Sequence, residues 1–115
     1  MFHLAWYEQE IALPSMQQWL AGPCPDEGQI DEDAAWATNT AALEALLAAF
    51  RDVRAQQLEL LPELAAVDWE SVRDTLWGPM PLRWVVTKTY QHMAEHINDV
   101  LRIALFWDFY AEEQP

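Results

Sequence analysis

Residues 81–110 read PLRWVVTKTYQHMAEHINDVLRIALFWDFY. Pro81 suits the first position of a helix, because its backbone is already close to helical and the missing amide hydrogen is not needed there. At 1.5 Å per residue, a helix from Pro81 to Tyr110 would be about 45 Å long. At 100° per residue, one stripe less than a quarter-turn wide holds Val85, Thr89, His92, His96, Asp99, Ile103, Trp107 and Tyr110. The stretch therefore predicts a long helix whose stripe faces the protein interior.

Three further segments show a helical spacing of apolar residues, and prolines and glycines mark their ends. The first is expected to bend or break at Pro14 and to end at Gly22. The second follows Asp31, a good N-cap, and ends before Pro62. Residues 77–81 are expected to form a turn. In chain order, the expected helices are Phe2–Leu20, Asp31–Leu61, a short piece at Asp68–Leu76, and Pro81–Tyr110.

The two long helices, Asp31–Leu61 and Pro81–Tyr110, have nearly equal expected lengths. Their similarity predicts an antiparallel pair, against which the first helix packs. The chain of 115 residues has the size of one domain. We therefore expect an all-α fold, an up-and-down helical bundle that forms a single domain over residues 1–115.

The composition limits the classes of partner. Six basic and nineteen acidic residues give a net charge of −13, which disfavours binding to nucleic acids and to anionic membrane surfaces. No apolar run approaches the ~20 residues of a membrane span, and no secretory signal is visible. The single cysteine, Cys24, cannot form a disulfide within the chain. We expect a soluble protein of the reducing cytoplasm that binds neither nucleic acid nor membrane.

The three histidines of the chain form the strongest candidate site. His92 and His96 are four residues apart, so their side chains lie one above the other on a helix. His3 lies on the inward side of the first helix. Because three neutral imidazoles are a common ligand set for Zn²⁺, Ni²⁺ and related ions, we predict one divalent metal site at His3, His92 and His96. Asp99 or Glu95 would tune a water or thiolate bound there.

Two other interpretations of the histidines stay open. Pairs of histidines at this spacing also occur as ordinary core residues. In addition, His92-Met93-Ala94-Glu95-His96 matches the H-x-x-E-H pattern of inverted zinc proteases, in which the glutamate is the general base. Glu95 points about 60° away from the inward stripe, and a chain this small lacks room for a peptide cleft. The protease interpretation is therefore the weakest of the three.

With these residues placed, the chain resembles the DinB-like superfamily, which includes metal-dependent thiol S-transferases and mycothiol-dependent maleylpyruvate isomerases. Residues 1–8, MFHLAWYE, resemble the family's second helix, in which a histidine precedes an aromatic-acidic pair. His92 and His96 resemble the paired ligands of its last helix. The segment Ile30–Trp69 is similar to its third helix and the connector that follows.

The resemblance implies a four-helix bundle that carries a three-histidine site for zinc or nickel. It also implies that the open coordination positions bind a low-molecular-weight thiol, activated as a thiolate, in a transferase or isomerase reaction on a small molecule. After the paired ligands many relatives continue with Arg and Gln, whereas this chain has Ile97, Asn98 and Asp99. The substrate is therefore not carried over from the resemblance.

The family's first helix has no counterpart in this sequence, which begins two residues before His3. An uncovered bundle face would expose apolar and aromatic side chains, so we expect a homodimer. The sequence leaves open whether the protein is an enzyme. The alternative is a non-catalytic helical interaction module, in which any metal only fastens the first helix to the last.

Overall fold

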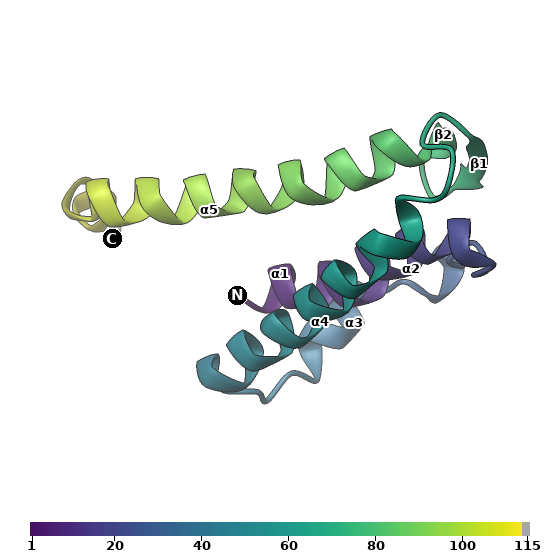
Figure 1. The fold of residues 1–115 in the computed structure, drawn as a ribbon. Coiled ribbons are helices and arrows are strands. Elements are labelled where there is room, and N and C mark those ends of the chain that lie inside the picture. Colours follow the sequence, from purple (N-terminus) through teal and green to yellow (C-terminus); the bar gives the residue numbers. More distant parts are fainter. Residues whose placement is uncertain (114–115) are drawn as a thin grey trace.

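The computed structural model describes residues 1–113 and is mostly helical, which confirms the expected all-α class (Figure 1). The chain forms three long helical runs, one short helix and one small β-hairpin. In chain order the elements are α1 Phe2–Tyr7, η1 Glu8–Ala12, α2 Leu13–Gln17, η2 Gln18–Leu20, η3 Glu27–Gln29, α3 Glu32–Ala37, α4 Leu43–Leu64, β1 Val72–Thr75, β2 Gly78–Pro81 and α5 Leu82–Glu113.

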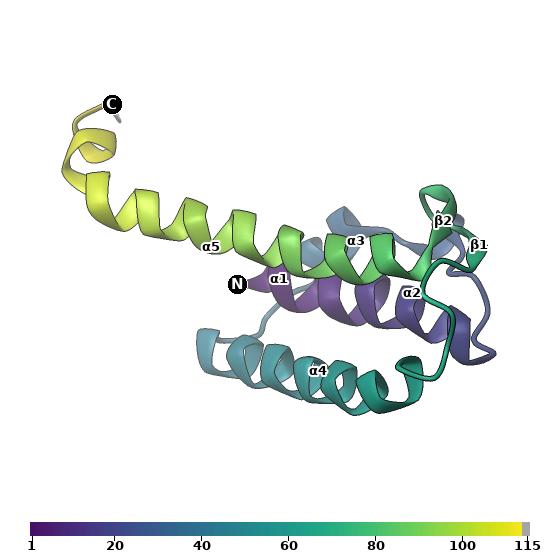
Figure 2. The ribbon, with the colours of Figure 1, turned by 45° about the horizontal axis from the view of Figure 1, so that its top comes forward.

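The first helical run is continuous from Phe2 to Leu20, as the sequence predicted, and it lies between α4 and α5 (Figure 2). It neither breaks nor leaves the helix at Pro14. The chain forms a wider π-helical turn, η1, directly before this proline. Such a turn accommodates the missing amide hydrogen and the bulk of the proline ring. The run ends at Ala21, which adopts a left-handed backbone with φ of 67°.

The expected single helix over residues 31–61 is wrong, because it is divided into α3 and α4. Asp31 does cap α3, since its carboxylate accepts a hydrogen bond from the amide of Ala34 at 3.0 Å. The interruption follows at Thr38 and Asn39. The Asn39 side chain accepts from the amide of Ala41 at 3.2 Å, and such local bonds compete with helix continuation. The 22 residues of α4 are fewer than the 32 of α5, so the equal lengths are also wrong.

The expected helical piece at 68–76 is wrong as well, and the turn expected at 77–81 is instead mostly strand β2, with the turn itself at residues 76–77. Residues 72–81 form an antiparallel hairpin in which Thr75 pairs with Gly78. Gly78 has a φ of +88°, which a glycine adopts without strain, and the Thr75 hydroxyl donates to the Gly78 carbonyl at 2.7 Å. Trp19 joins the hairpin region to the first helical run, because its indole donates to the Ser71 carbonyl at 3.1 Å.

The last helix begins one residue after Pro81 and has two unlike parts. Residues 82–96 pack on the rest of the molecule. Their first turns form a common core with the first helical run and with the end of α4. The buried core cluster consists of Met16, Trp19, Leu64, Leu82, Val85 and Val86. We call residues 97–109 the arm, and every residue of the arm is exposed. Ile103 and Trp107, expected to face the interior, are 49% and 60% exposed, so the predicted inward stripe ends at His96.

The two views agree that the arm projects from the body of the molecule (Figures 1 and 2). Its projection accounts for the elongated dimensions of 51 × 29 × 26 Å. Within the described residues, none of the helices is both long enough and apolar enough to cross a lipid bilayer.

Candidate metal centre

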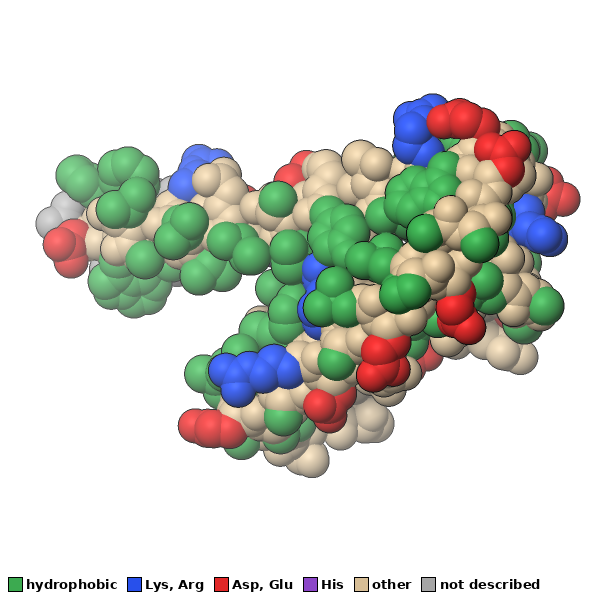
Figure 3. All heavy atoms as spheres, viewed as in Figure 1, with side chains coloured by type: hydrophobic (Ala, Val, Ile, Leu, Met, Phe, Trp, Pro, Cys, Tyr) green, Lys and Arg blue, Asp and Glu red, His purple; other side chains and the backbone are tan. Residues whose placement is uncertain are grey.

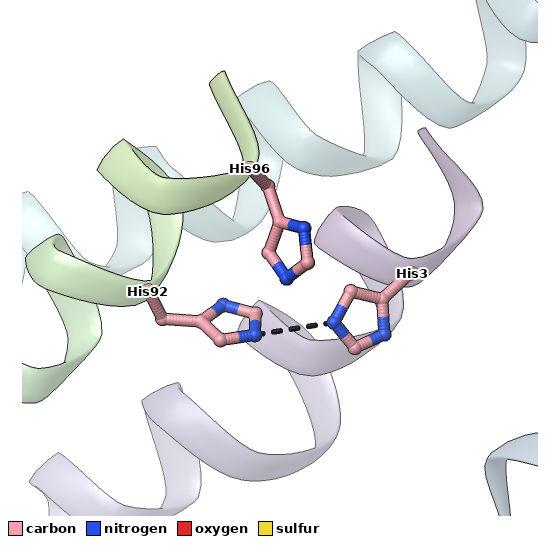
Figure 4. Close-up of side chains that lie close together, drawn as sticks. All are labelled: His3, His92 and His96. Atoms are coloured by element: carbon pink, nitrogen blue, oxygen red, sulfur yellow. Dashed lines mark hydrogen bonds between the residues drawn. The ribbon is translucent and has the colours of Figure 1, made fainter. Parts of the chain in front are cut away.

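The structure brings the three predicted histidines together at the start of α1 and the middle of α5 (Figure 4). Each ring offers one nitrogen to a common point, and these three nitrogens lie within 4.8 Å of one another. The Nε2 atoms of His3 and His92 are 3.1 Å apart. In Figure 4 the nitrogen of His96 that is remote from its backbone points toward the other two rings. The helical spacing on α5 and the position of His3 on α1 together create this convergence.

The spacing of the nitrogens fits a divalent ion. A tetrahedral ion with bonds of 2.0–2.1 Å holds its ligand atoms about 3.3 Å apart, close to the observed separation of His3 and His92. The third nitrogen, on His96, lies within 4.8 Å of the other two. Three imidazoles leave a fourth position free for a water molecule or a substrate atom. The donor set therefore suits zinc or nickel.

Glu32 of α3 contacts the first of the three histidines, and this contact was not predicted from the sequence. Its two carboxylate oxygens lie 2.7 and 2.8 Å from Nδ1 of His3. A proton on Nδ1, donated to the carboxylate, leaves the lone pair of Nε2 directed at the other histidines. Carboxylates hold metal-binding histidines in this way in many proteins. The contact was missed because 29 residues separate Glu32 from His3 in the sequence.

His92 is the most buried of the three histidines, with 9% of its surface exposed. Burial, and then the neighbouring rings of His96 and His3, lower its pKa from 6.5 to about 4. Its ring is therefore neutral at physiological pH and needs to lose no proton before it binds a metal. Its Nδ1 atom is buried without a hydrogen-bond partner in the part of the chain that the structure describes. The polar contact of the His92 ring is therefore the one between its Nε2 atom and Nε2 of His3.

Tyr7 fixes the plane of the His92 ring from one turn further along the first helical run. The two rings are stacked, with centroids 3.6 Å apart and an angle of 16° between their planes. Burial, and then the negative charge of Glu8, raise the pKa of Tyr7 to about 12. The phenol therefore stays protonated. The inward spacing of His3 and Tyr7 was visible in the sequence, but the stacking partner was not.

Asp99 and Glu95, the two predicted tuning residues, lie at the edge of the site. Oδ2 of Asp99 is 3.6 Å from Nδ1 of His96, which is too long for a good hydrogen bond, and the Asp99 side chain is 57% exposed. Glu95 is exposed as well. Both carboxylates are therefore more weakly engaged than Glu32.

A buried polar network anchors the first helical run beneath the histidines. Glu8 is fully buried and accepts a hydrogen bond from Arg54 of α4 at 2.7 Å and another from Gln57. The guanidinium of Arg54 also lies 4.9 Å from the ring centre of Tyr90 on α5. The network links the three long helical runs, so it fixes how far α1 stands from α5.

A cavity of about 550 Å³ borders the site on the side of His3 and Glu32. Its walls come from α1, α3 and the beginning of α4, and they include the rings of Phe2 and Trp36, which meet edge to face at 5.1 Å. The volume is sufficient for a small organic molecule.

One family model matches this sequence. The model of the DinB superfamily matches residues 1–100, which include all three histidines and Glu32. The comparisons with curated proteins and with solved structures give no match.

Proposed function

The chain belongs to the DinB superfamily, and on this premise we propose that it binds one divalent transition-metal ion, zinc or nickel, through His3, His92 and His96. The convergence of three imidazole nitrogens within 4.8 Å carries this proposal. The carboxylate of Glu32 behind His3 and the neutral state of His92 support it further. Glu32 would hold one ligand in place, and Tyr7 would hold another.

We further propose that the site serves thiol chemistry of the transferase or isomerase class, in the reducing cytoplasm where free thiols are abundant. A bound divalent ion lowers the pKa of a thiol or water at its open position. The residues of this chain orient the ligands and provide the adjoining cavity, whose apolar walls suit a small organic substrate. Asp99, beside His96, is placed to take part in proton exchange with solvent.

A panel of low-molecular-weight thiols, offered with small electrophiles to zinc-loaded and nickel-loaded protein, tests the reaction. We expect turnover that depends on the metal and is lost in His92→Ala. The exposed neighbour Gln91 supplies the matched control, since Gln91→Ala should retain turnover. Metal-bound protein that is silent with every thiol would contradict the enzymatic role.

The second candidate function is a helical interaction module in which the metal fastens α1 to α5. The observation that favours it is the exposed apolar arm, which suits binding to another protein surface better than catalysis. In that case metal loading would raise the melting temperature of the wild type and not of His92→Ala. No thiol would then be consumed.

A further inference from the structure

The arm contains eight of the fourteen large apolar side chains that are exposed in the described part of the chain. Their exposed fractions range from 45% for Ile97 to 75% for Leu105. The others in this set are Val100, Leu101, Ile103, Phe106, Trp107 and Phe109. By helical spacing, the six of them up to Phe106, where the helix is kinked, already lie on all sides of the arm. A helix that is apolar all round is stable in water only when other elements cover it.

From these observations we infer that the arm is the self-association surface of a homodimer, in which the arms of two copies pack against each other. This inference is independent of the metal chemistry, because it concerns residues beyond His96 and would hold in the metal-free protein.

The exposed area of the arm is sufficient for a stable dimer. At roughly 200 Å² for a fully exposed large apolar side chain, the eight residues expose on the order of 900 Å² per copy. A standard protein interface buries about 800 Å² per partner. A twofold axis places the same surface on both copies, so the side of each arm that faces the axis would be covered by the equally apolar side of the other arm.

The charge distribution favours a second copy over other partners. The whole chain has a net charge of −13, yet the arm has only Asp99, Arg102 and Asp108 as charged residues. Two copies that meet through their arms therefore bring together the segments that repel each other least. An anionic membrane would be repelled by the remaining acidic surface, and the arm offers a single cation to attract one.

The shape of the molecule allows two arms to meet. In the space-filling view the arm is mostly apolar and stands away from α4, with an open notch between them (Figure 3). On α4, Leu43 and Leu47 are exposed apolar residues as well.

Sedimentation equilibrium of the wild type and of two matched variants tests the inference. Leu105→Glu adds a charge to the arm, and Leu58→Glu adds the same charge at a similarly exposed leucine of α4, 53% exposed. We expect a dimer for the wild type and for Leu58→Glu, and at least a tenfold weaker dimer for Leu105→Glu. Circular dichroism would verify that each variant retains its helices.

A cross-linking experiment locates the contact. In a Cys24→Ser background, Leu105→Cys should give a disulfide-linked dimer under mild oxidation, whereas Leu58→Cys should not. A wild type that stays monomeric at tens of micromolar would overturn the inference, whether it then binds lipid vesicles or another protein. A dimer that Leu105→Glu leaves intact would overturn it too.

Discussion

The arm is the more apolar of the two parts of α5 and is nevertheless the exposed one, since nine of its 13 residues are apolar against seven of the 15 residues at 82–96. Residues 82–96 contain the buried side chains Leu82, Val85, Val86, Thr89 and His92, whereas no residue of the arm is buried. This difference in burial arises from the elements that lie against each part of the helix. The first helical run and the end of α4 cover the packed part, and the cover ends where α1 begins, beside His3 and His96. The histidine site therefore lies at the boundary between the two parts.

The comparison shows that an apolar stripe predicts a helix well but does not predict its burial. A helix forms because its residues favour it and its backbone bonds are internal, while burial needs a second element at the right place. The packed part obtains this element from its own chain. The arm, by our inference, obtains it from a second copy.

The largest effect is expected from the network that fixes the packed part to the other helices. Glu8→Ala removes a fully buried carboxylate and leaves Arg54 without its ion-pair partner. Breaking such a pair by removing one partner should lower the free energy of unfolding by about 4 kcal/mol in urea denaturation. Glu10→Ala, at an exposed site of the same helical run, is the control and should change little. Equal losses in the two variants would contradict the anchoring role.

A pair of identical substitutions measures the difference between the two parts directly. Leu82→Ala empties a fully buried position and should cost about 3 kcal/mol. Leu101→Ala, at a site that is 56% exposed, should stay within about 0.5 kcal/mol when the protein is dilute enough to be monomeric. Urea unfolding followed by circular dichroism gives both values. A large loss for Leu101→Ala under these conditions would mean that the arm packs within its own chain.

At the histidine site, Glu32 and Asp99 each lie beside a ring nitrogen, but Glu32 is within hydrogen-bond distance and Asp99 is not. Glu32→Gln should weaken zinc affinity by roughly 10-fold to 100-fold, because both of its oxygens contact His3. Asp99→Asn should change it by less than about threefold, because that carboxylate is more exposed and more distant from His96. Competition with a chromophoric chelator measures both affinities. If the order were reversed, Asp99 would be the residue that orients a ligand.

The smallest expected effect is a pH dependence of the metal-free protein. The pKa of His92 is about 4 in the folded state and close to 6.5 when unfolded, so between these values the unfolded state holds the extra proton. The free energy of unfolding should therefore fall as the pH decreases through this interval. Urea titrations at about pH 5 and pH 7, with a chelator present, should show a smaller decrease in His92→Gln than in the wild type. An identical decrease in both would contradict the burial of a neutral imidazole.

Local sequence signals predicted the helices whose ends are marked by their own residues. The first helical run and the beginning of α5 lie within one residue of the expected bounds, and Asp31 caps α3 as expected. The interruption at Thr38 and Asn39 was missed because each residue is tolerated within a helix, and only their hydrogen bonds to nearby backbone groups end it. The hairpin at 72–81 was missed because four-residue strands show too little alternation to be separated from a short helix.

The candidate site was partly predictable for a similar reason. Helical spacing places His92 and His96 on one face, and the inward side of the first helix contains His3, so their approach followed from the sequence. The contact of Glu32 with His3 did not, because it depends on how α3 folds back after the eleven residues 21–31, which contain the short helix η3. The structure brings the three rings together, and metal binding remains a prediction.

Elemental analysis of the untagged protein tests that central claim most directly. The wild type and Glu95→Ala, which alters an exposed neighbour, should contain about one equivalent of zinc or nickel after loading and gel filtration. His96→Ala should contain much less while keeping its helical circular dichroism spectrum. Wild-type protein that is folded but retains no transition metal after loading would contradict the account. The three histidines would then be packing residues between α1 and α5.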